Sequence, residues 1–230
     1  MTTATKMTLS RTTLDVLKNY ASINSNILVR PGNTLTTISG VKNIMAEAVV
    51  EETFDTEFGI WDLNKFLGTI SLFDSPVFDF EDNFVRITNG NSKSEVVYYY
   101  SAPNLLTTSS NKINMPESVI SFQLKETDLQ ELQKAASVLQ LPDLVVRSGN
   151  DKIELAVLDK ADTSTNVYSI DVGDLTDSSE FSFYFKVDNM KMISGDYDVD
   201  ITEKEVSQFT HKTQDIKYWV ALESDSTFTR

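Results

Sequence analysis

LSRTTLDVLKNYAS (residues 9–22) and LKETDLQELQKAAS (residues 124–137) are two stretches of one chain that nearly repeat each other. In both, apolar residues recur at intervals of three and four, the spacing of one face of an α-helix. Ser10 or Thr12 can cap the first helix, and Thr127 can cap the second. At an offset of 115 residues the identical pairs are Leu9/Leu124, Thr12/Thr127, Leu14/Leu129, Leu17/Leu132, Ala21/Ala136 and Ser22/Ser137. The sequence therefore predicts one helix built twice.

A second pair of similar segments follows these two helices in the same order. FGIWDLNKF (residues 58–66) is answered by YFKVDNMKM (residues 184–192), which matches Asp62 with Asp188 and Lys65 with Lys191. Both pieces follow a strand-like segment, and the aspartate of each can cap a short helix. We therefore expect two helices in each half of the chain.

Almost all of the remaining sequence is typical of short strands. Runs rich in β-branched and aromatic residues alternate with turn signals at spacings of about 8 to 12 residues, which indicates antiparallel sheets. A stretch rich in Ser, Thr and Asn with two prolines separates the halves, although its apolar residues suggest that it lies against the body. We predict an α+β fold with two similar domains, 1–102 and 118–230, joined by a connector, 103–117.

The composition limits the class of protein. Of the 230 residues, 40% are apolar and 10% aromatic, which suffices to bury a core. Without cysteine there can be no disulfide, thiol nucleophile or thiolate metal site. No apolar run reaches the roughly 18 residues of a membrane-spanning helix, and MTTATKMTLS lacks the apolar core of a signal peptide. We expect a cytoplasmic protein.

Chemically reactive motifs are missing from the sequence. There is no phosphate-binding glycine loop and no nucleophile elbow. DVGDLTDSSE (residues 171–180) lacks the spacing of a calcium loop. His211 is the single histidine, and its polar surroundings in the sequence predict a surface position. We expect a scaffold without enzymatic activity, cofactor or metal.

The net charge of −14 argues against nucleic-acid binding by the average surface. It does not say where the 20 basic residues lie. An acidic exterior is the ordinary property of a solvated protein surface.

Four pieces of sequence resemble a known family: LKNYASINS (17–25), WDLNKFLG (61–68), DNMKMISGDY (188–197) and VALESDS (220–226). They are similar to the sliding clamp of T-even-type bacteriophages, the ring-shaped processivity factor of the replicative DNA polymerase. The resemblance runs in order over nearly the whole chain and is poorest at residues 73–118. It implies a homotrimer of tandem clamp domains, whose helices line the hole and whose sheets form the rim.

The resemblance also implies partners and a place of action. The expected partners are double-stranded DNA, bound without regard to sequence, the phage DNA polymerase and a separate ATP-driven clamp loader. Late-gene transcription factors are a further partner of the family. The expected location is the cytoplasm of the infected host cell.

Basic residues on the predicted helices become candidates for the DNA-facing lumen. Arg11 and Lys18 are seven residues apart and so share one helix face, with Asp15 between them. The expected lumen residues are Arg11, Lys18, Lys65, Lys134 and Lys191. The alternative is that these are solvated lysines on helix faces that need no partner.

Two further sites follow from the resemblance. An aromatic edge strand, with Tyr98, Tyr99 and Tyr100, would pair with a neighbouring subunit's strand around Val167 and Tyr168. Ordinary cross-strand packing remains an alternative for at least one of the tyrosines. A pocket for partner peptides would lie between the domains, with candidate residues Leu106, Ile113, Val220 and Leu222.

Two other functions compete with the clamp. A β-rich phage virion protein would not need matching basic positions on equivalent helices. A glycan-acting enzyme would need a carboxylate pair in a cleft, for which the sequence offers no convincing candidate.

Overall fold

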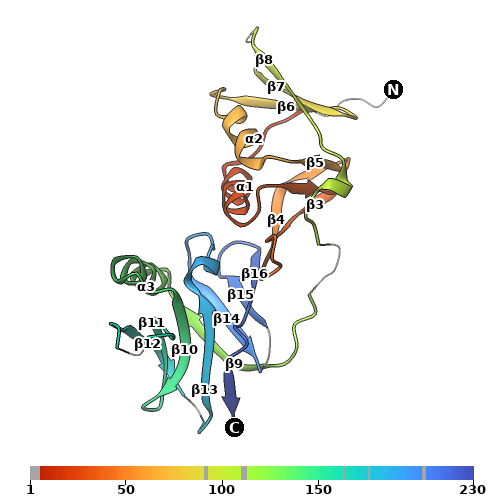
Figure 1. The fold of residues 1–230 in the computed structure, drawn as a ribbon. Helices are drawn as coiled ribbons and strands as arrows, with labels where there is room; N and C mark the ends of the chain where they lie inside the picture. Colours follow the sequence, from red (N-terminus) through yellow and green to blue (C-terminus); the bar gives the residue numbers. More distant parts are fainter. Residues whose placement is uncertain (1–5, 91–92, 110–112, 163, 176, 204–205) are drawn as a thin grey trace. The chain divides into compact units, whose positions relative to one another are not determined.

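The computed structural model describes residues 6–90, 93–109, 113–162, 164–175, 177–203 and 206–230. It consists of two compact units, Met1–Lys112 and Ile113–Arg230 (Figure 1). The predicted connector, 103–117, overlaps the point of division, and its residues 110–112 lie outside the described residues. The predicted boundaries at 102 and 118 stay a prediction.

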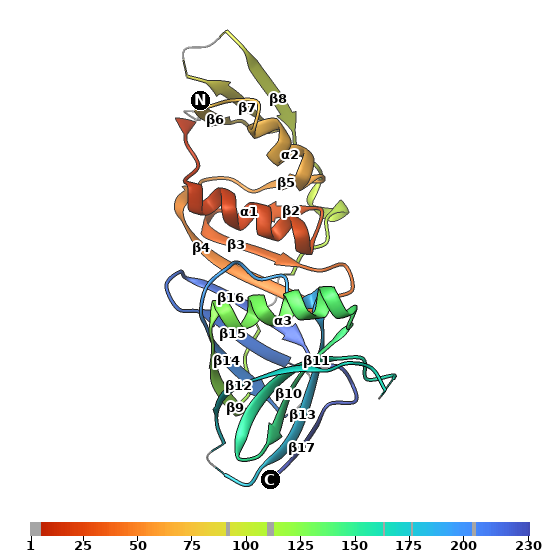
Figure 2. The ribbon, with the colours of Figure 1, turned by 90° about the vertical axis from the view of Figure 1, so that its left-hand side faces the viewer.

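Unit 1 contains two α-helices and antiparallel strands. Strands β1, β6, β7 and β8 form a four-stranded sheet in that order, β3 pairs with β4, and β2 pairs with β5. Both helices lie on the same side of the strands and contact each other (Figure 2). The elements are β1 (Lys6–Met7), α1 (Arg11–Ile23), β2 (Ile27–Val29), β3 (Gly32–Ile38), β4 (Ile44–Phe54), β5 (Phe58–Ile60), α2 (Leu63–Ile70), β6 (Pro76–Phe80), β7 (Phe84–Asn89), β8 (Glu95–Tyr99) and the 3₁₀ turn η1 (Pro103–Leu105).

The helices of unit 1 begin at caps that the sequence predicts. The Ser10 side chain accepts a hydrogen bond from the Thr13 N–H, and Asp62 accepts one from the Lys65 N–H at 2.8 Å. Helix α1 buries its apolar stripe against β3 and β4, where the Tyr20 hydroxyl donates to the Leu35 carbonyl at 3.2 Å. The predictions of Ser10 and Asp62 as caps are confirmed.

Unit 2 has one α-helix among its described residues and two groups of antiparallel strands. The first sheet has the order β12-β11-β10-β13-β17, and in the second β16, β15, β14 and β9 are neighbours. Helix α3 packs against β11 and β12. The elements are β9 (Ser118–Leu124), α3 (Glu126–Leu139), β10 (Asp143–Gly149), β11 (Lys152–Leu158), β12 (Tyr168–Asp174), β13 (Glu180–Lys186), the 3₁₀ turn η2 (Val187–Asn189), β14 (Tyr197–Thr202), β15 (Val206–His211), β16 (Ile216–Ala221) and β17 (Thr227–Thr229). The predicted α+β class with antiparallel sheets is confirmed.

The beginning of α3 differs from its prediction. Thr127 is not the cap, because the helix already begins at Glu126 and Lys125 occupies the cap position without a side-chain hydrogen bond. Instead, the Glu126 N–H donates to the Asp196 carboxylate at 2.9 Å. Strand β9 runs to Leu124, so the helix starts directly where the strand ends, and its first N–H is satisfied from a distant segment.

The second helix predicted for unit 2 is also wrong. Residues 187–189 form only the 3₁₀ turn η2, and Lys191 lies beyond it. The segment between β13 and β14 spans residues 187–196, whereas residues 61–75 separate β5 from β6 in unit 1. The shorter connection leaves no room for a full helix, and the buried Met190 packs there while its carbonyl accepts from Gln133 of α3 at 2.9 Å.

His211 is buried at the end of β15, contrary to the expectation of a surface residue. Its Nδ1 accepts hydrogen bonds from the N–H groups of Thr213 and Gln214, both at 3.2 Å, so Nε2 carries the proton and faces the Ser194 carbonyl. The ring occupies the space that a Cβ atom would need at Gly195, whose φ is +149°. Both the space and the backbone conformation therefore require glycine there.

Candidate functional site

The exposed face of α1 carries two of the predicted lumen cations with an acid between them. Arg11 and Lys18 are 96% and 63% exposed. Asp15 lies 3.0 Å from the Lys18 Nζ and 3.9 Å from the Arg11 Nε. The structure thus brings Arg11 and Lys18 onto one helix face, as the seven-residue spacing predicts.

The other predicted lumen residues are exposed as well. Lys65 lies on α2 and Lys134 on α3, and within the described part of the chain neither side chain makes a hydrogen bond or ion pair. Lys191 is exposed beyond η2. Lysine side chains on open helix faces can reach phosphates without reading bases.

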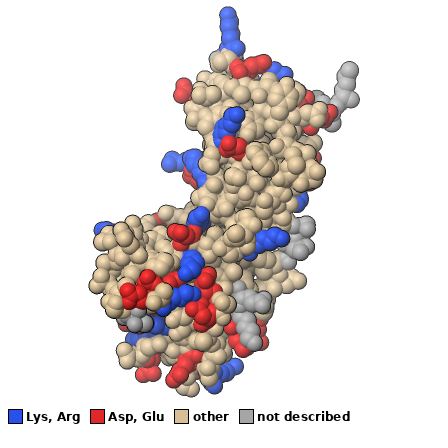
Figure 3. Space-filling model, in the orientation of Figure 1, with Lys and Arg blue, Asp and Glu red and all other residues tan. Residues whose placement is uncertain are grey.

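Acidic side chains lie among the basic side chains on the surface. Helix α3 carries Glu126, Asp128 and Glu131 beside Lys134. On the face of unit 2 that Figure 3 presents, acidic and basic side chains are interspersed rather than segregated. Any attraction for a polyanion is therefore local to particular helix faces, and the DNA-facing role of the five residues stays a prediction.

The aromatic strand β8 lies at an edge of its sheet, as predicted, but its tyrosines differ in role. Tyr98 points into its own unit, where its hydroxyl donates to the Asp62 carbonyl at 3.1 Å and its ring packs edge-on against Phe66. Burial raises the pKa of Tyr98. Tyr99 is 72% exposed. The edge can therefore offer its backbone and Tyr99 to a second chain, while Tyr98 supports the strand from within.

Tyr100 follows β8 and also packs inward. Its ring stacks on Phe58 with centroids 5.1 Å apart. Its hydroxyl is buried and has no hydrogen-bond partner within the described part of the chain. Burial raises the pKa of this phenol. Ordinary packing within the unit, the alternative weighed for these residues, thus describes both in the single chain: Tyr100 packs against Phe58 of strand β5, whereas Tyr98 packs against helix α2 rather than across strands.

The strand predicted to receive this edge, β12, also lies at the edge of its sheet. Val167, which precedes it, is 52% exposed. The Tyr168 hydroxyl donates to the Glu131 carboxylate of α3 at 3.2 Å. Each unit therefore presents one of the two predicted edges, and their pairing stays a prediction.

The four predicted peptide-pocket residues have different surroundings. Leu106 packs so closely on Gly59 that no side chain would fit at that glycine. Ile113 and Leu222 are half-buried, whereas Val220 is fully buried in β16. Val220 is therefore the least accessible of the four, and a pocket that joins them stays a prediction.

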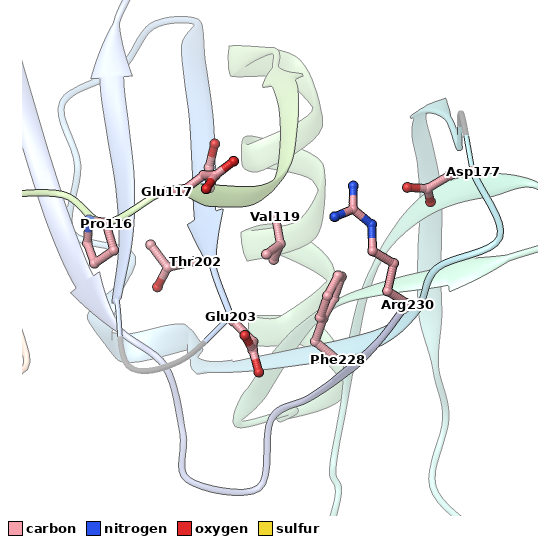
Figure 4. A pocket seen from close by; sticks show the side chains of 9 residues that line it. Pro116, Glu117, Val119, Asp177, Thr202, Glu203, Phe228 and Arg230 are labelled. Atoms are coloured by element: carbon pink, nitrogen blue, oxygen red, sulfur yellow. The ribbon is translucent and has the colours of Figure 1, made fainter.

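Unit 2 contains a pocket of about 440 Å³ that includes none of these four residues (Figure 4). It lies where the end of the connector meets β9 and the last strand, β17. In Figure 4 the Arg230 side chain extends toward Asp177, and the Phe228 ring lies between Arg230 and Glu203. The lining residues are Pro116, Glu117, Ser118, Val119, Asp177, Thr202, Glu203, Phe228 and Arg230.

The sequence held weak signals for this pocket. Phe228 is a single aromatic residue in a polar tail, and Pro116 ends the connector directly before a strand. Neither position reveals its neighbours, because β17 reaches the pocket only by pairing with β13. The described residues contain no cluster of three or more His, Asp or Glu side chains suited to a metal ion. Nor do they contain a helix long and apolar enough to cross a membrane.

Comparisons with known proteins agree over nearly the full chain. The family described as "gp45 sliding clamp, C terminal" matches residues 121–224. The sliding clamp of Vibrio phage KVP40 is 31% identical over 223 residues, which cover 95% of this chain and 100% of that protein. The sliding clamp of Enterobacteria phage T4 is 30% identical over 227 residues, which cover 96% of this chain and 99% of that protein.

A solved structure shows the same fold at low sequence identity. PCNA of A. fulgidus, determined with the C-terminal region of FEN-1 bound, superposes with a TM-score of 0.68 at 13% identity. The match covers 98% of this chain and 97% of PCNA. The prediction of tandem clamp domains is confirmed, and the alternative of a virion structural protein has no support.

Proposed function

Because this chain belongs to the sliding clamp family of T4-like bacteriophages, we propose that it acts as a DNA polymerase processivity clamp. Three copies would close into a ring around duplex DNA and tether the replicative polymerase to its template. The chain itself would be non-catalytic, and a separate ATP-driven loader would open the ring, since this chain has no nucleotide-binding motif.

A ring solves a problem that ordinary binding cannot. Strong base contacts would stop a protein from moving along DNA, whereas enclosure retains the duplex while every contact stays weak. Lysines directed at phosphates suit this task, because phosphates are the same at each step. Electrostatic attraction also fades within about 8 Å at physiological salt, so a chain of net charge −14 can still present cations to enclosed DNA.

Membership of the family over nearly the whole chain is the observation that carries this proposal. The free edges of β8 and β12 support it, since an unpaired edge readily accepts a strand from another chain. Tyr99 on β8 and Val167 beside β12 are the exposed apolar side chains available at such a junction.

The pocket of unit 2 is a second place that we propose for a short peptide of the polymerase, besides the predicted pocket of Leu106, Ile113, Val220 and Leu222. Phe228, Val119 and Pro116 offer apolar contact, while Glu117 and Arg230 offer charge at its rim. A groove of this kind recognises anchor side chains, so several partners can use it in turn. The clamp loader and late-gene transcription factors are further proposed partners, and the proposed place of action is the cytoplasm of the infected host cell.

Solution mass tests the ring directly. Light scattering on a size-exclusion column, over a range of concentrations, should give three times the 25.8 kDa mass of the chain, falling toward the monomer on dilution. Tyr99→Asp should shift the dissociation to higher concentration. Val41→Asp, a matched change at the β3–β4 turn where the side chain is 80% exposed, should leave it unchanged. A monomer at every concentration would overturn the ring.

A further inference from the structure

Asp15 is the one acid on the exposed face of α1 that lies between two predicted DNA-facing cations. We propose that Asp15 restrains the grip of the clamp on DNA by holding Lys18 and Arg11 away from the phosphates. This inference rests on the proposed function and names a residue that tunes it. Asp15 would thereby help to keep the ring mobile.

The geometry favours competition for Lys18 above all. One Asp15 carboxylate oxygen lies 3.0 Å from the Lys18 Nζ, within hydrogen-bond distance. The other oxygen faces the Arg11 Nε at 3.9 Å. A phosphate that approaches this face competes with the carboxylate for the charge of the Lys18 ammonium, and it is repelled by the same carboxylate as it does so.

The two lysines on the other helices lack such a partner. Neither Lys65 nor Lys134 has a side-chain ion pair among the described residues. Among the predicted lumen residues on the three described α-helices, restraint by a paired acid is therefore a property of α1. In a ring of three subunits, each helix α1 would contribute one restrained pair of cations.

Helix stability does not require an aspartate at this position. The helix dipole favours an acid only in the first turn of α1, and Asp15 lies beyond that turn. Aspartate also has a lower helix propensity than most residues. The Arg11–Asp15 pair has the base on the N-terminal side, the weaker orientation for residues four apart. The Asp15–Lys18 pair, with the acid three residues before the base, adds only a modest helix stabilisation, so the main role that remains is an effect on the charge of the face.

Asp15→Asn tests the proposal in the full-length protein. Binding to a short fluorescent duplex, followed by anisotropy over a range of salt, should tighten about threefold to tenfold at low salt, because three copies each release cations toward phosphates. The slope of log K against log salt should steepen by about 0.9 for each added phosphate contact. Unchanged affinity and slope would overturn the proposal.

A matched control separates this effect from a change in net charge. Asp151→Asn makes the same substitution in the β10–β11 turn, where the carboxylate has no partner among the described residues and φ is +59°, a conformation that asparagine tolerates. It should leave DNA affinity within about twofold of the parent, since Asp151 belongs to the other unit and pairs with none of the predicted lumen cations among the described residues. An equal gain in both variants would overturn a specific role for Asp15.

The double variant Arg11→Gln/Lys18→Gln tests whether Asp15 acts on DNA binding through these two cations. Asp15→Asn should lose most of its effect there, because the cations that it restrains are gone. A full effect in this background would mean that Asp15 repels DNA directly and would overturn restraint through Lys18. If instead no variant, including the double cation variant, alters DNA binding, the lumen assignment of Arg11 and Lys18 fails and so does the role of Asp15, whereas the ring of the proposed function is tested separately by the solution mass.

Discussion

Helices α1 and α3 share a pattern of apolar residues but begin in different ways. Helix α1 has a local cap, Ser10, and the Glu52 carboxylate of β4 accepts hydrogen bonds from the Ser10 N–H and the Thr13 hydroxyl. Helix α3 has no local cap, and Asp196 accepts from its first N–H across seventy residues of sequence. The duplicated part is the apolar stripe, while the helix ends are specific to each unit.

The same contrast holds for the second helix of the repeat. Unit 1 builds α2, whose buried residues include Leu63 and Phe66. Unit 2 replaces it with the turn η2 and the buried Met190. Lys65 lies within helix α2, whereas the matching Lys191 follows the turn η2, so the two units can be perturbed separately.

The largest effect should come from the core beneath α2. Phe66→Ala should lower the free energy of unfolding by about 3–5 kcal/mol, because it removes a buried ring that packs against Phe78 and Tyr98. Met190→Ala in unit 2 should cost about 2–5 kcal/mol by the same cavity argument. Urea denaturation measures both. Leu72→Ala, at a 71% exposed position, is the control and should change stability by less than about 0.5 kcal/mol.

The next largest difference should be between the stability costs of removing Asp62, which caps α2, and Asp188, the matched residue in η2. Asp62→Ala should cost about 1 kcal/mol, because the Lys65 N–H loses its acceptor. Asp188→Ala, the matched position in the repeat, should stay within about 0.5 kcal/mol, because Asp188 is exposed and caps no helix. Chemical denaturation of the two variants measures the difference, and equal losses would contradict the assignment of α2 and η2.

The hydrogen bond from the start of α3 to Asp196 can be tested by removing it and then supplying a local cap. Asp196→Ala should cost about 1 kcal/mol, because the Glu126 N–H loses its carboxylate. Adding Lys125→Ser supplies a local cap at a position that already has extended backbone angles, and should recover much of that loss. Thermal unfolding follows the series, with Lys134→Ser inside the helix as the control that should not rescue.

The smallest effect concerns a cross-strand ion pair in each unit. In unit 2, hydrogen bonding and charge from Arg147 hold the pKa of Glu154 below its ordinary value. A depressed folded pKa contributes stability above the unfolded value near 4.5, and this stability is lost as pH falls through the folded value. Glu154→Gln should therefore flatten the acid limb of a stability profile below about pH 4.5.

The corresponding pair in unit 1 is Arg86–Glu95. Its Glu95 side chain is 49% exposed, whereas the Glu154 side chain is 18% exposed. Glu95→Gln should change the same profile less, since exposed pairs contribute little. Unfolding midpoints collected from neutral to acidic pH compare the two variants. A steeper acid dependence after Glu154→Gln would contradict the sign of the pKa shift.

Features fixed by local sequence were predictable. The buried stripe of Val16, Leu17, Tyr20 and Ile23 in α1 and the caps Ser10 and Asp62 depend on residues close together in the chain. The edge position of the tyrosine strand was instead expected from the family resemblance, because it depends on the order of the strands in the sheet. Helical periodicity and capping are properties of short segments, which explains why one sequence suffices to find them.

Features that depend on distant partners were missed. The start of α3 depends on Asp196, and the burial of His211 depends on the space left by Gly195. The pocket of unit 2 depends on the pairing of β17 with β13. Strand register and the length of a connection decide each of these, and a single sequence reveals neither.

The contact between Gly195 and His211 limits how this family can change through evolution. A side chain at position 195 would collide with the imidazole ring, so this glycine can be replaced only after the ring has gone and the backbone has left its φ of +149°. Loss of the histidine alone would leave the N–H groups of Thr213 and Gln214 without an acceptor. Among related sequences, the two positions should therefore change together or not at all.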